Sequence, residues 1–197
     1  MPTFSPSPPL TPPCLGQLHL RPILPEDAER LMPIESVSFG RFHWSPDAFR
    51  NELANTMARY WLMEDPSTHI VWGYVGCWDI LGEGHITTVA VHPLARGKGW
   101  GDVLISHALA YLFQQQVQSI TLEVRITNLS AQSLYYKYGF SQVGKRPRYY
   151  QDTQEDALLL TFLPDEEGKK SLFEQRCYMA WQRNQHHWPS QHHVLFE

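Results

Sequence analysis

The sequence VHPLARGKGWG, residues 91–101, joins an apolar stretch to an amphipathic one. Residues 86–91 predict a buried strand, and residues 102–115 carry apolar side chains at helical spacing. Three glycines between them allow a tight turn in which backbone N–H groups converge on one point. The N-terminus of the following helix adds partial positive charge at that point. We therefore predict that the turn binds the pyrophosphate of a nucleotide-like cofactor; a plain strand–helix turn is the alternative.

The spacing of the glycines separates this turn from two other phosphate-binding patterns. A dinucleotide fold needs G-x-G-x-x-G and an acidic residue about 20 positions further on, where this chain has Thr121. A P-loop ends in Gly-Lys-Ser/Thr, which this turn lacks. The pattern here is Arg96-x-x-Gly99-x-Gly101 in the middle of the chain.

Composition indicates one globular domain of 197 residues with a substantial core. A net charge of −4 argues against direct nucleic-acid binding, and no apolar run reaches the length of a membrane span. Cys14, Cys77 and Cys177 have neither metal-ligand nor redox spacing. An odd number of cysteines without a secretion signal predicts a cytoplasmic protein.

The predicted elements alternate irregularly: a strand, two helices, three strands, a helix, a strand, a helix and two strands. The strands are expected at 18–22, 60–64, 70–78, 84–91, 120–125, 140–144 and 157–163, and the helices from 25, from 45, at 102–115 and at 130–138. This order predicts a mixed sheet with helices on its faces. A proline-rich lead-in, 1–16, precedes the domain at 17–163, and a helical, histidine-rich tail, 164–197, follows it.

Further motifs follow the glycine turn. L-E-V-R-x-x-N spans 122–128, L-Y-x-x-x-G-F spans 134–140, and R-x-x-Y-Y begins at Arg146. Each motif also has a purely structural explanation. Glu123 can be an ion-pair partner on a strand, Tyr135 a core aromatic, and Asn128 a helix cap.

Together with the glycine turn, these motifs resemble the GCN5-related N-acetyltransferase (GNAT) family over about residues 17–163. They are most similar to its RimI-type branch, bacterial enzymes that acetylate the N-terminal alanine of a small-subunit ribosomal protein. The resemblance implies an α+β fold whose mixed, mostly antiparallel sheet is flanked by helices on both faces. It also implies that the sheet splays between strands 84–91 and 120–125.

The resemblance also implies which residues act. Glu123 corresponds to the general base and Tyr135, rather than the adjacent Tyr136, to the general acid. The acetyl-CoA contacts fall on Val89, Ala90, Val91, Arg96, Gly97, Lys98, Gly99, Trp100, Gly101, Asp102 and Asn128. No metal is implied.

The chemistry of amide formation fits these residue types. An α-amino group has a pKa of about 7.7–8.0, so a modest base such as Glu123, acting directly or through water, can deprotonate it. Arg125 lies two residues on, on the same strand face, where it can lower the pKa that partial burial would raise. A tyrosine hydroxyl can protonate the leaving thiolate. Cys77 has no legible histidine partner, so a covalent route is disfavoured.

Aromatic residues are the candidates for substrate binding. Phe42, Trp44, Tyr149 and Tyr150 can line a slot for the first residues of a peptide, and Glu35 is a candidate to receive its ammonium group. Alternatively, Phe42 and Trp44 form a hydrophobic staple around Ser45. The histidine pairs at 186–187 and 192–193 lack the ligands of a zinc site.

The function expected from the sequence is acetyl-CoA-dependent acetylation of the N-terminal residue, alanine, of a small-subunit ribosomal protein. Two alternatives stay open at this level. One is acetylation of a lysine side chain or a small-molecule amine, and the other is a non-catalytic acyl-CoA-binding module.

Overall fold

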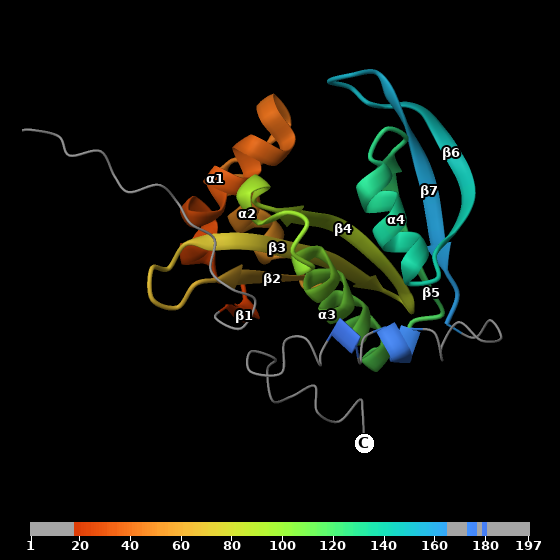
Figure 1. The fold of residues 1–197 in the computed structure, drawn as a ribbon, viewed down its shortest axis with the longest axis horizontal. Helices are drawn as coiled ribbons and strands as arrows, with labels where there is room; N and C mark the ends of the chain where they lie inside the picture. Colours follow the sequence, from red (N-terminus) through yellow and green to blue (C-terminus); the bar gives the residue numbers. More distant parts are fainter. Residues whose placement is uncertain (1–17, 165–172, 177–178, 181–197) are drawn as a thin grey trace, which may run out of the picture.

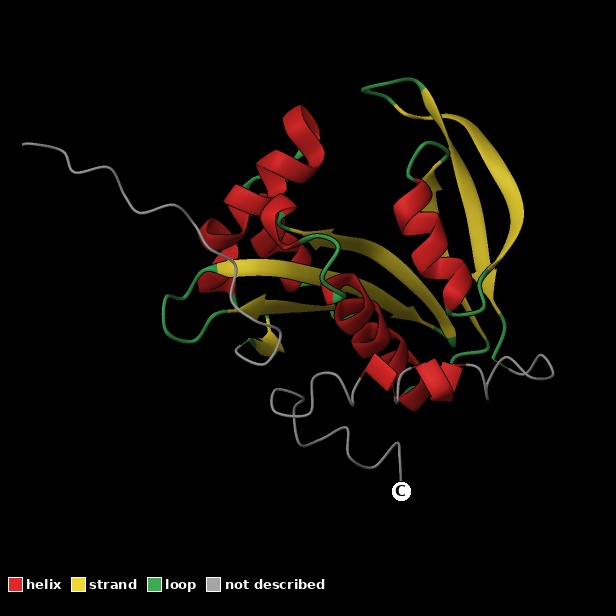
Figure 2. Cartoon of the chain, in the orientation of Figure 1, coloured by secondary structure: helices red, strands yellow, loops and turns green. Residues whose placement is uncertain are grey.

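The computed structural model describes residues 18–164, 173–176 and 179–180, and these form a seven-stranded sheet with helices on both faces (Figures 1 and 2). The strands are β1 His19–Pro22, β2 Ala58–Glu64, β3 Val71–Ile80, β4 Glu83–Val91, β5 Ser119–Arg125, β6 Ser141–Tyr150 and β7 Glu155–Phe162. The helices are α1 Ala28–Phe39, α2 Pro46–Leu53, α3 Trp100–Gln114 and α4 Leu129–Lys137, with 3-10 turns at Pro25–Asp27, Gly40–Phe42 and Pro93–Ala95. The predicted α+β class is confirmed.

The sheet separates at its centre. Its strand order is β1-β2-β3-β4-β5-β7-β6, and every neighbouring pair is antiparallel except β4 and β5. These two parallel strands pair only where Glu83–His85 faces Ser119–Thr121. Beyond His85 they diverge, so β7 and β6 stand apart from β1–β4 (Figure 1). The splay predicted between these strands is confirmed.

Each face of the sheet has its own core. Ala28, Leu31 and Ile34 of α1 pack with Phe49 of α2 on one face. On the other face, α3 packs its buried stripe against the inward-facing residues of β5 and β7. Along β5, side chains alternate, so Ile120, Leu122 and Val124 enter the α3 core while Thr121, Glu123 and Arg125 face the other side. Period-two alternation thus places Glu123 on the face of α1 and α2.

A bulge interrupts β4 beside the splay. Cys77 of β3 pairs with Ile86, but the next pair joins Gly76 to Thr88, so Thr87 is an extra residue. A bulge of this kind breaks the alternation of side chains. As a result, Thr87 and Thr88 both line a cavity on the face of α1 and α2.

Two predicted boundaries were wrong. β6 was expected at 140–144, but it continues to Tyr150 and includes Pro147. An edge strand tolerates proline and charged residues because one row of its backbone groups faces solvent. α3 begins at Trp100 rather than Asp102. The other elements agree within a few residues, and Gly139, with φ of 92°, ends α4 as predicted.

The lead-in at 1–16 and the histidine pairs lie outside the described residues. The described part of the tail is helical, and Phe173 stacks on Phe113 of α3 with ring centroids 4.0 Å apart. Among the described residues, no helix has the length and apolar character needed to cross a membrane.

An ion-pair cluster ties the start of α1 to the sheet. Arg21 of β1 donates to Asp27 at 2.7 Å and to Glu64 of β2 at 2.6 Å. Arg30 of α1 donates to the same two carboxylates. Burial alone would raise the pKa of Asp27, but the hydrogen bonds from Arg21, the Leu24 N–H and Arg30 lower it to about 2.

We predict that Asp27→Asn lowers the free energy of unfolding by about 2 kcal/mol at pH 7, because the variant loses these charge-assisted bonds. The folded-state pKa lies below the unfolded value of 3.8, so the contribution is present above about pH 4 and lost as the pH falls towards 2. Urea unfolding at pH 7 and at pH 3 measures it. Asp47→Asn, at an ion pair whose carboxylate side chain is 88% exposed, is the control and should change stability by less than about 0.5 kcal/mol. Equal effects of the two substitutions would contradict the prediction.

Candidate functional site

The glycine turn presents bare backbone at the start of α3. Gly97 and Gly99 have φ of 73° and 83°, which other residues adopt only with strain. No side chain caps the first turn of α3, whose N-cap is Gly99. A Cβ at Gly97 or Gly99 would meet no atom within 4 Å, so the surface over the turn is open. An anion can therefore approach the N–H groups closely.

The side chains of this turn mostly face elsewhere. Arg96 folds back and donates to the Val91 carbonyl at 3.0 Å, while Lys98 is exposed. Trp100 is buried in the core beside Trp72, and Asp102 accepts from Lys137 and Tyr138 of α4. Trp100 and Asp102 thus have only their backbone to offer a pyrophosphate, while Arg96 and Lys98 are both exposed to solvent.

The remaining predicted cofactor contacts flank the opening. Val89 and Val91 pack partly buried against the α3 core, whereas Ala90 is buried in the core of α1 and α2. Asn128 accepts from the Ala131 N–H at 3.1 Å and is the N-cap of α4. The helix-cap interpretation of Asn128 is confirmed, and its side-chain amide hydrogens remain the groups it can offer to a ligand.

Glu123 lies where β4 and β5 separate and contacts two basic side chains. His85 of β4 places Nε2 3.3 Å from one carboxylate oxygen, and Arg146 of β6 places Nη1 3.2 Å from the other. The Glu123 side chain is 11% exposed. A carboxylate so placed can accept a proton directly or through the His85 ring.

The environment of His85 favours its neutral form. Burial lowers the pKa of His85 below its usual 6.5, the Glu123 carboxylate opposes that change, and Arg146 adds to it. The other ring nitrogen, Nδ1, lies 3.0 Å from the Thr121 hydroxyl, which orients the ring. His85 is therefore available as a proton acceptor near pH 7.

Two tyrosines lie near each other, and one of them, Tyr150, is close enough to Glu123 to feel its charge. Burial raises the pKa of the Tyr135 phenol, whose side chain reaches from α4 to the neighbourhood of Tyr150. Burial also raises the pKa of Tyr150, to about 12, although the Arg125 guanidinium opposes that rise. Both phenols keep their protons at neutral pH, so each can donate a hydrogen bond.

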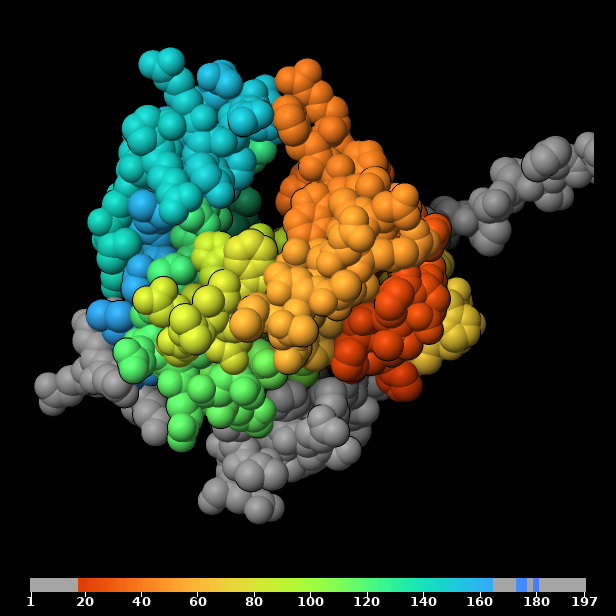
Figure 3. Space-filling model, turned by 180° about the vertical axis from the view of Figure 1, so that it is seen from behind, coloured from red at the N-terminus to blue at the C-terminus, as the bar shows by residue number. Residues whose placement is uncertain are grey.

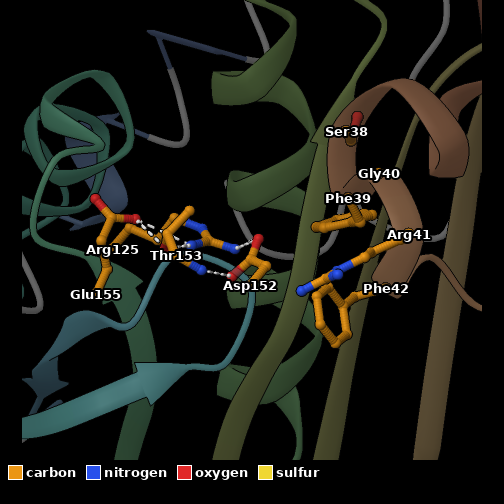
Figure 4. A pocket seen from close by; sticks show the side chains of 9 residues that line it. All are labelled: Ser38, Phe39, Gly40, Arg41, Phe42, Arg125, Asp152, Thr153 and Glu155. Atoms are coloured by element: carbon orange, nitrogen blue, oxygen red, sulfur yellow. Dashed lines mark hydrogen bonds and ion pairs between the residues drawn. The ribbon is translucent and has the colours of Figure 1, made fainter.

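Arg125 lies on the same face of β5 as Glu123, as expected, but it pairs with other carboxylates. It donates to Asp152 at 2.7 Å and to Glu155 at 3.0 Å (Figure 4). Its guanidinium also covers the Tyr150 ring at 4.0 Å. The β6–β7 turn supplies these carboxylates, which a sequence pattern cannot place. The guanidinium that approaches Glu123 is that of Arg146.

An open cleft of about 330 Å3 lies between the two halves of the molecule. One wall is the loop after α1, with Phe39, Arg41 and Phe42, and the other is Arg125 with residues 152–155 of the β6–β7 turn (Figure 4). From behind, a hollow separates the β6–β7 half from the α1–α2 half (Figure 3). An extended peptide can enter here.

A smaller cavity of about 120 Å3 opens on the same face. Its lining is aromatic and hydroxylic with one buried carboxylate: Glu35, Phe39, Phe42, Trp44, Phe49, Tyr74, Thr87 and Thr88. Glu35 accepts from the Trp44 N–H at 2.7 Å and from the Tyr74 hydroxyl, so both of its oxygens are engaged.

Trp44 forms the hydrophobic staple that the sequence offered as an alternative, and it also faces a cavity. Ser45 caps α2 by accepting from the Ala48 N–H, and Trp44 contacts Phe49 with ring centroids 5.3 Å apart, which is a hydrophobic staple. Trp44 also lines the small cavity together with Phe42. Tyr149, by contrast, lies under Arg146 at 5.4 Å and contacts Tyr150.

His85, Arg146 and the cavity threonines were missed as site residues. Alternation along 84–91 puts His85 on the face opposite Gly84 and Ile86, and pairing with a strand 36 residues later brings it to Thr121 and Glu123. Only the first of these facts is visible in the sequence. Among the described residues, no group of histidine, cysteine or acidic side chains is arranged to hold a metal.

Comparison with known sequences identifies relatives of this chain. The model of the "Acetyltransferase (GNAT) family" matches residues 27–140. A Bacillus subtilis protein provisionally named a ribosomal protein bS18-alanine N-acetyltransferase is 34% identical over 135 residues, covering 68% of this chain and 88% of that protein. N-alpha-acetyltransferase RimI of Mycobacterium tuberculosis is 34% identical over 137 residues, covering 66% and 83%.

Solved structures share the fold. The ribosomal-protein-S18-alanine N-acetyltransferase of Escherichia coli has a TM-score of 0.67 at 23% identity, covering 77% of this chain and 97% of that one. A variant of spermidine N-acetyltransferase SpeG from Vibrio cholerae has a TM-score of 0.66 at 20% identity, covering 79% and 98%. Because one fold serves both a protein and a polyamine substrate in these structures, fold alone does not choose the substrate.

We predict opposite shifts in the His85 pKa when its two charged neighbours are removed. Glu123→Gln should lower it further, because the carboxylate stabilises the imidazolium, and Arg146→Gln should raise it. Histidine side-chain NMR titration of the two variants measures both. Shifts of the same sign would show that the two groups do not act on His85 through their charges.

Proposed function

Because the chain belongs to the GNAT family of acetyltransferases, we propose that it transfers the acetyl group of acetyl-CoA to the N-terminal α-amine of a protein. We propose alanine as that first residue and a small-subunit ribosomal protein as the substrate, in keeping with the names of its relatives. A ribosomal substrate would place the reaction in the cytoplasm. The observation that carries the proposal is the position of Glu123, just beyond the point where β4 and β5 separate.

The glycine turn suits the pyrophosphate of acetyl-CoA. Its backbone is free of side chains at Gly97 and Gly99, α3 starts without a side-chain cap, and Lys98 is exposed beside it. Acetyl-CoA supplies the activated acetyl thioester. The edge of β4 at 89–91 then offers backbone groups where the strand has lost its partner β5.

The small cavity suits the first residue of the substrate. Its volume of about 120 Å3 has room for a small side chain such as that of alanine. The open cleft between Phe42 and the 152–155 turn leads away from the site and gives the following residues a path. A lysine side chain or a free polyamine would have no need of that path.

The reaction requires one proton to leave the amine and one to reach the sulfur. Glu123, directly or through His85 or water, takes the proton of the amine as its nitrogen attacks the carbonyl carbon of the thioester. Tyr135 donates its phenolic proton to the thiolate as the carbon–sulfur bond breaks. The amide and free CoA are the products, and exchange of the transferred proton with solvent restores both side chains.

We predict that Glu123→Gln and Tyr135→Phe each lower kcat by about a hundredfold or more, because each removes a proton-transfer group. CoA affinity should stay within about threefold of that of the unchanged protein, since neither side chain belongs to the glycine turn. Acetylation of a peptide that begins with alanine and has the N-terminal sequence of the small-subunit ribosomal protein is measured by mass spectrometry. Tyr136→Phe is the matched control, because its side chain is 42% exposed and adjacent, and it should keep full activity.

The outcomes separate the candidate substrates. Acetylation of the peptide at its α-amine supports the proposal. Acetylation of only a lysine side chain or a free amine, with no gain at the peptide N-terminus, would replace the substrate proposed here. A loss of rate in Tyr136→Phe but not in Tyr135→Phe would move the acid to the neighbouring residue.

A further inference from the structure

A chain of hydrogen bonds runs from α2 to the small cavity. Glu52 accepts from both the Trp78 indole N–H and the Tyr60 hydroxyl, the latter at 3.2 Å. The Tyr60 oxygen lies 3.0 Å from the hydroxyl of Thr87, the bulge residue of β4. Thr87 lines the cavity, so the chain connects its wall to a half-exposed carboxylate.

The hydrogens that each group carries determine which group donates and which accepts in this series of hydrogen bonds. The indole N–H can only donate, so the Glu52 oxygen that receives it is an acceptor. Tyr60 has one hydroxyl hydrogen and gives it to that carboxylate, and burial raises the pKa of the phenol, so it keeps this hydrogen. The contact with Thr87 must then be made by the threonine hydrogen. The remaining lone pair of the Thr87 oxygen is left for a donor in the cavity.

The arrangement is built across three strands. Tyr60 lies on β2 and reaches Thr87 on β4 by passing over β3 at Gly76. A Cβ at Gly76 would lie 2.0 Å from the Tyr60 ring, so only glycine leaves room for this path. The Tyr60 ring is thereby held against β3 at Gly76, and its hydroxyl is held by Glu52.

A second carboxylate and tyrosine stand beside the first pair. Glu35 is 2% exposed and accepts a hydrogen bond from the hydroxyl of Tyr74. Thr88, which follows Thr87 in β4, lies beside the Tyr74 hydroxyl but outside hydrogen-bonding geometry. The Thr88 oxygen is buried and has no hydrogen-bond partner among the described residues. The cavity thus has the hydroxyls of Thr87 and Thr88 in its wall, and each lies beside a tyrosine whose own hydrogen is given to a carboxylate.

We propose that the Thr87 oxygen accepts a hydrogen bond from the amine of the substrate, and that Glu52 and Tyr60 fix the hydroxyl in the orientation that makes it an acceptor. Tyr60 and Glu52 are positioning residues that act through Thr87. The site selects a ligand that carries an N–H donor, whether ammonium or neutral amine, over an isosteric ligand without one. This inference deepens the proposed function by assigning the group that holds the amine.

Two probes test it without turnover. One is a tripeptide amide that begins with alanine, and the other is the same compound with propionyl in place of alanine, which lacks only the amino group. Calorimetric titration into the protein saturated with CoA measures the affinity of each. The quantity of interest is the preference, the ratio of the two dissociation constants.

Thr87→Val keeps the shape of the side chain but removes the acceptor, and should reduce the preference for the amine about tenfold. Thr87→Ser keeps the hydroxyl and should retain most of the preference. Tyr60→Phe leaves Thr87 in place but removes the acceptor of the Thr87 hydroxyl hydrogen. That hydrogen can then turn into the cavity, so the preference for the amine should fall, as it does in Thr87→Val. Tyr111→Phe, on α3 against Trp61, is the control for loss of a phenol elsewhere and should change nothing.

A protein without any preference for the amine would overturn the inference, and so would a Thr87→Val variant that weakens both probes equally. A Tyr60→Phe variant that retains the full preference would overturn the orienting role. If the ribosomal peptide is not acetylated while the amine preference exists and depends on Thr87, the proposed substrate fails and this inference stands. The reverse result, acetylation with no dependence of the preference on Thr87, supports the function and rejects the inference.

Discussion

The loss of pairing between β4 and β5 after three residue pairs is the constraint on which the site depends. If these two strands stayed paired to their ends, their backbone groups would hydrogen-bond to one another and would not be available to a ligand. Here the end of β4 keeps free backbone groups, and the facing side of β5 keeps room for charged side chains. The glycine turn, Glu123 and both cavities all adjoin this separation.

The two sides of the opening use different chemistry. The turn after β4 offers backbone N–H groups, helix polarity and one exposed lysine, which suits an extended anion and is indifferent to most side chains. The opposite side offers side chains from α1, α2, β5 and β6, and their protonation is set by neighbours. His85 is kept neutral by burial, while Tyr135 and Tyr150 are kept protonated by the same effect. Groups that can accept a proton and groups that can donate one are therefore both present at neutral pH.

Ion pairing engages several of the charged groups around the splay. Arg125 is held by Asp152 and Glu155 and covers Tyr150, and it lines the open cleft. Asp102 is held by Lys137, which joins the start of α3 to α4. Glu123, by contrast, contacts His85 and the half-exposed Arg146.

The sequence by itself determined the element order, the glycine turn and the faces of the strands. These depend on local rules: glycine at positive φ, apolar periodicity, and caps such as Ser45 and Asn128. Glu123 and Tyr135 were assigned roles only through the resemblance of their motifs to the GNAT family. Only the tertiary structure decided that Arg146 rather than Arg125 approaches Glu123, that His85 joins it, and that Tyr60 crosses Gly76 to reach Thr87. Each of these contacts joins strands that lie far apart in the chain or across a bulge, and sequence spacing carries no information about the register in which such strands pair.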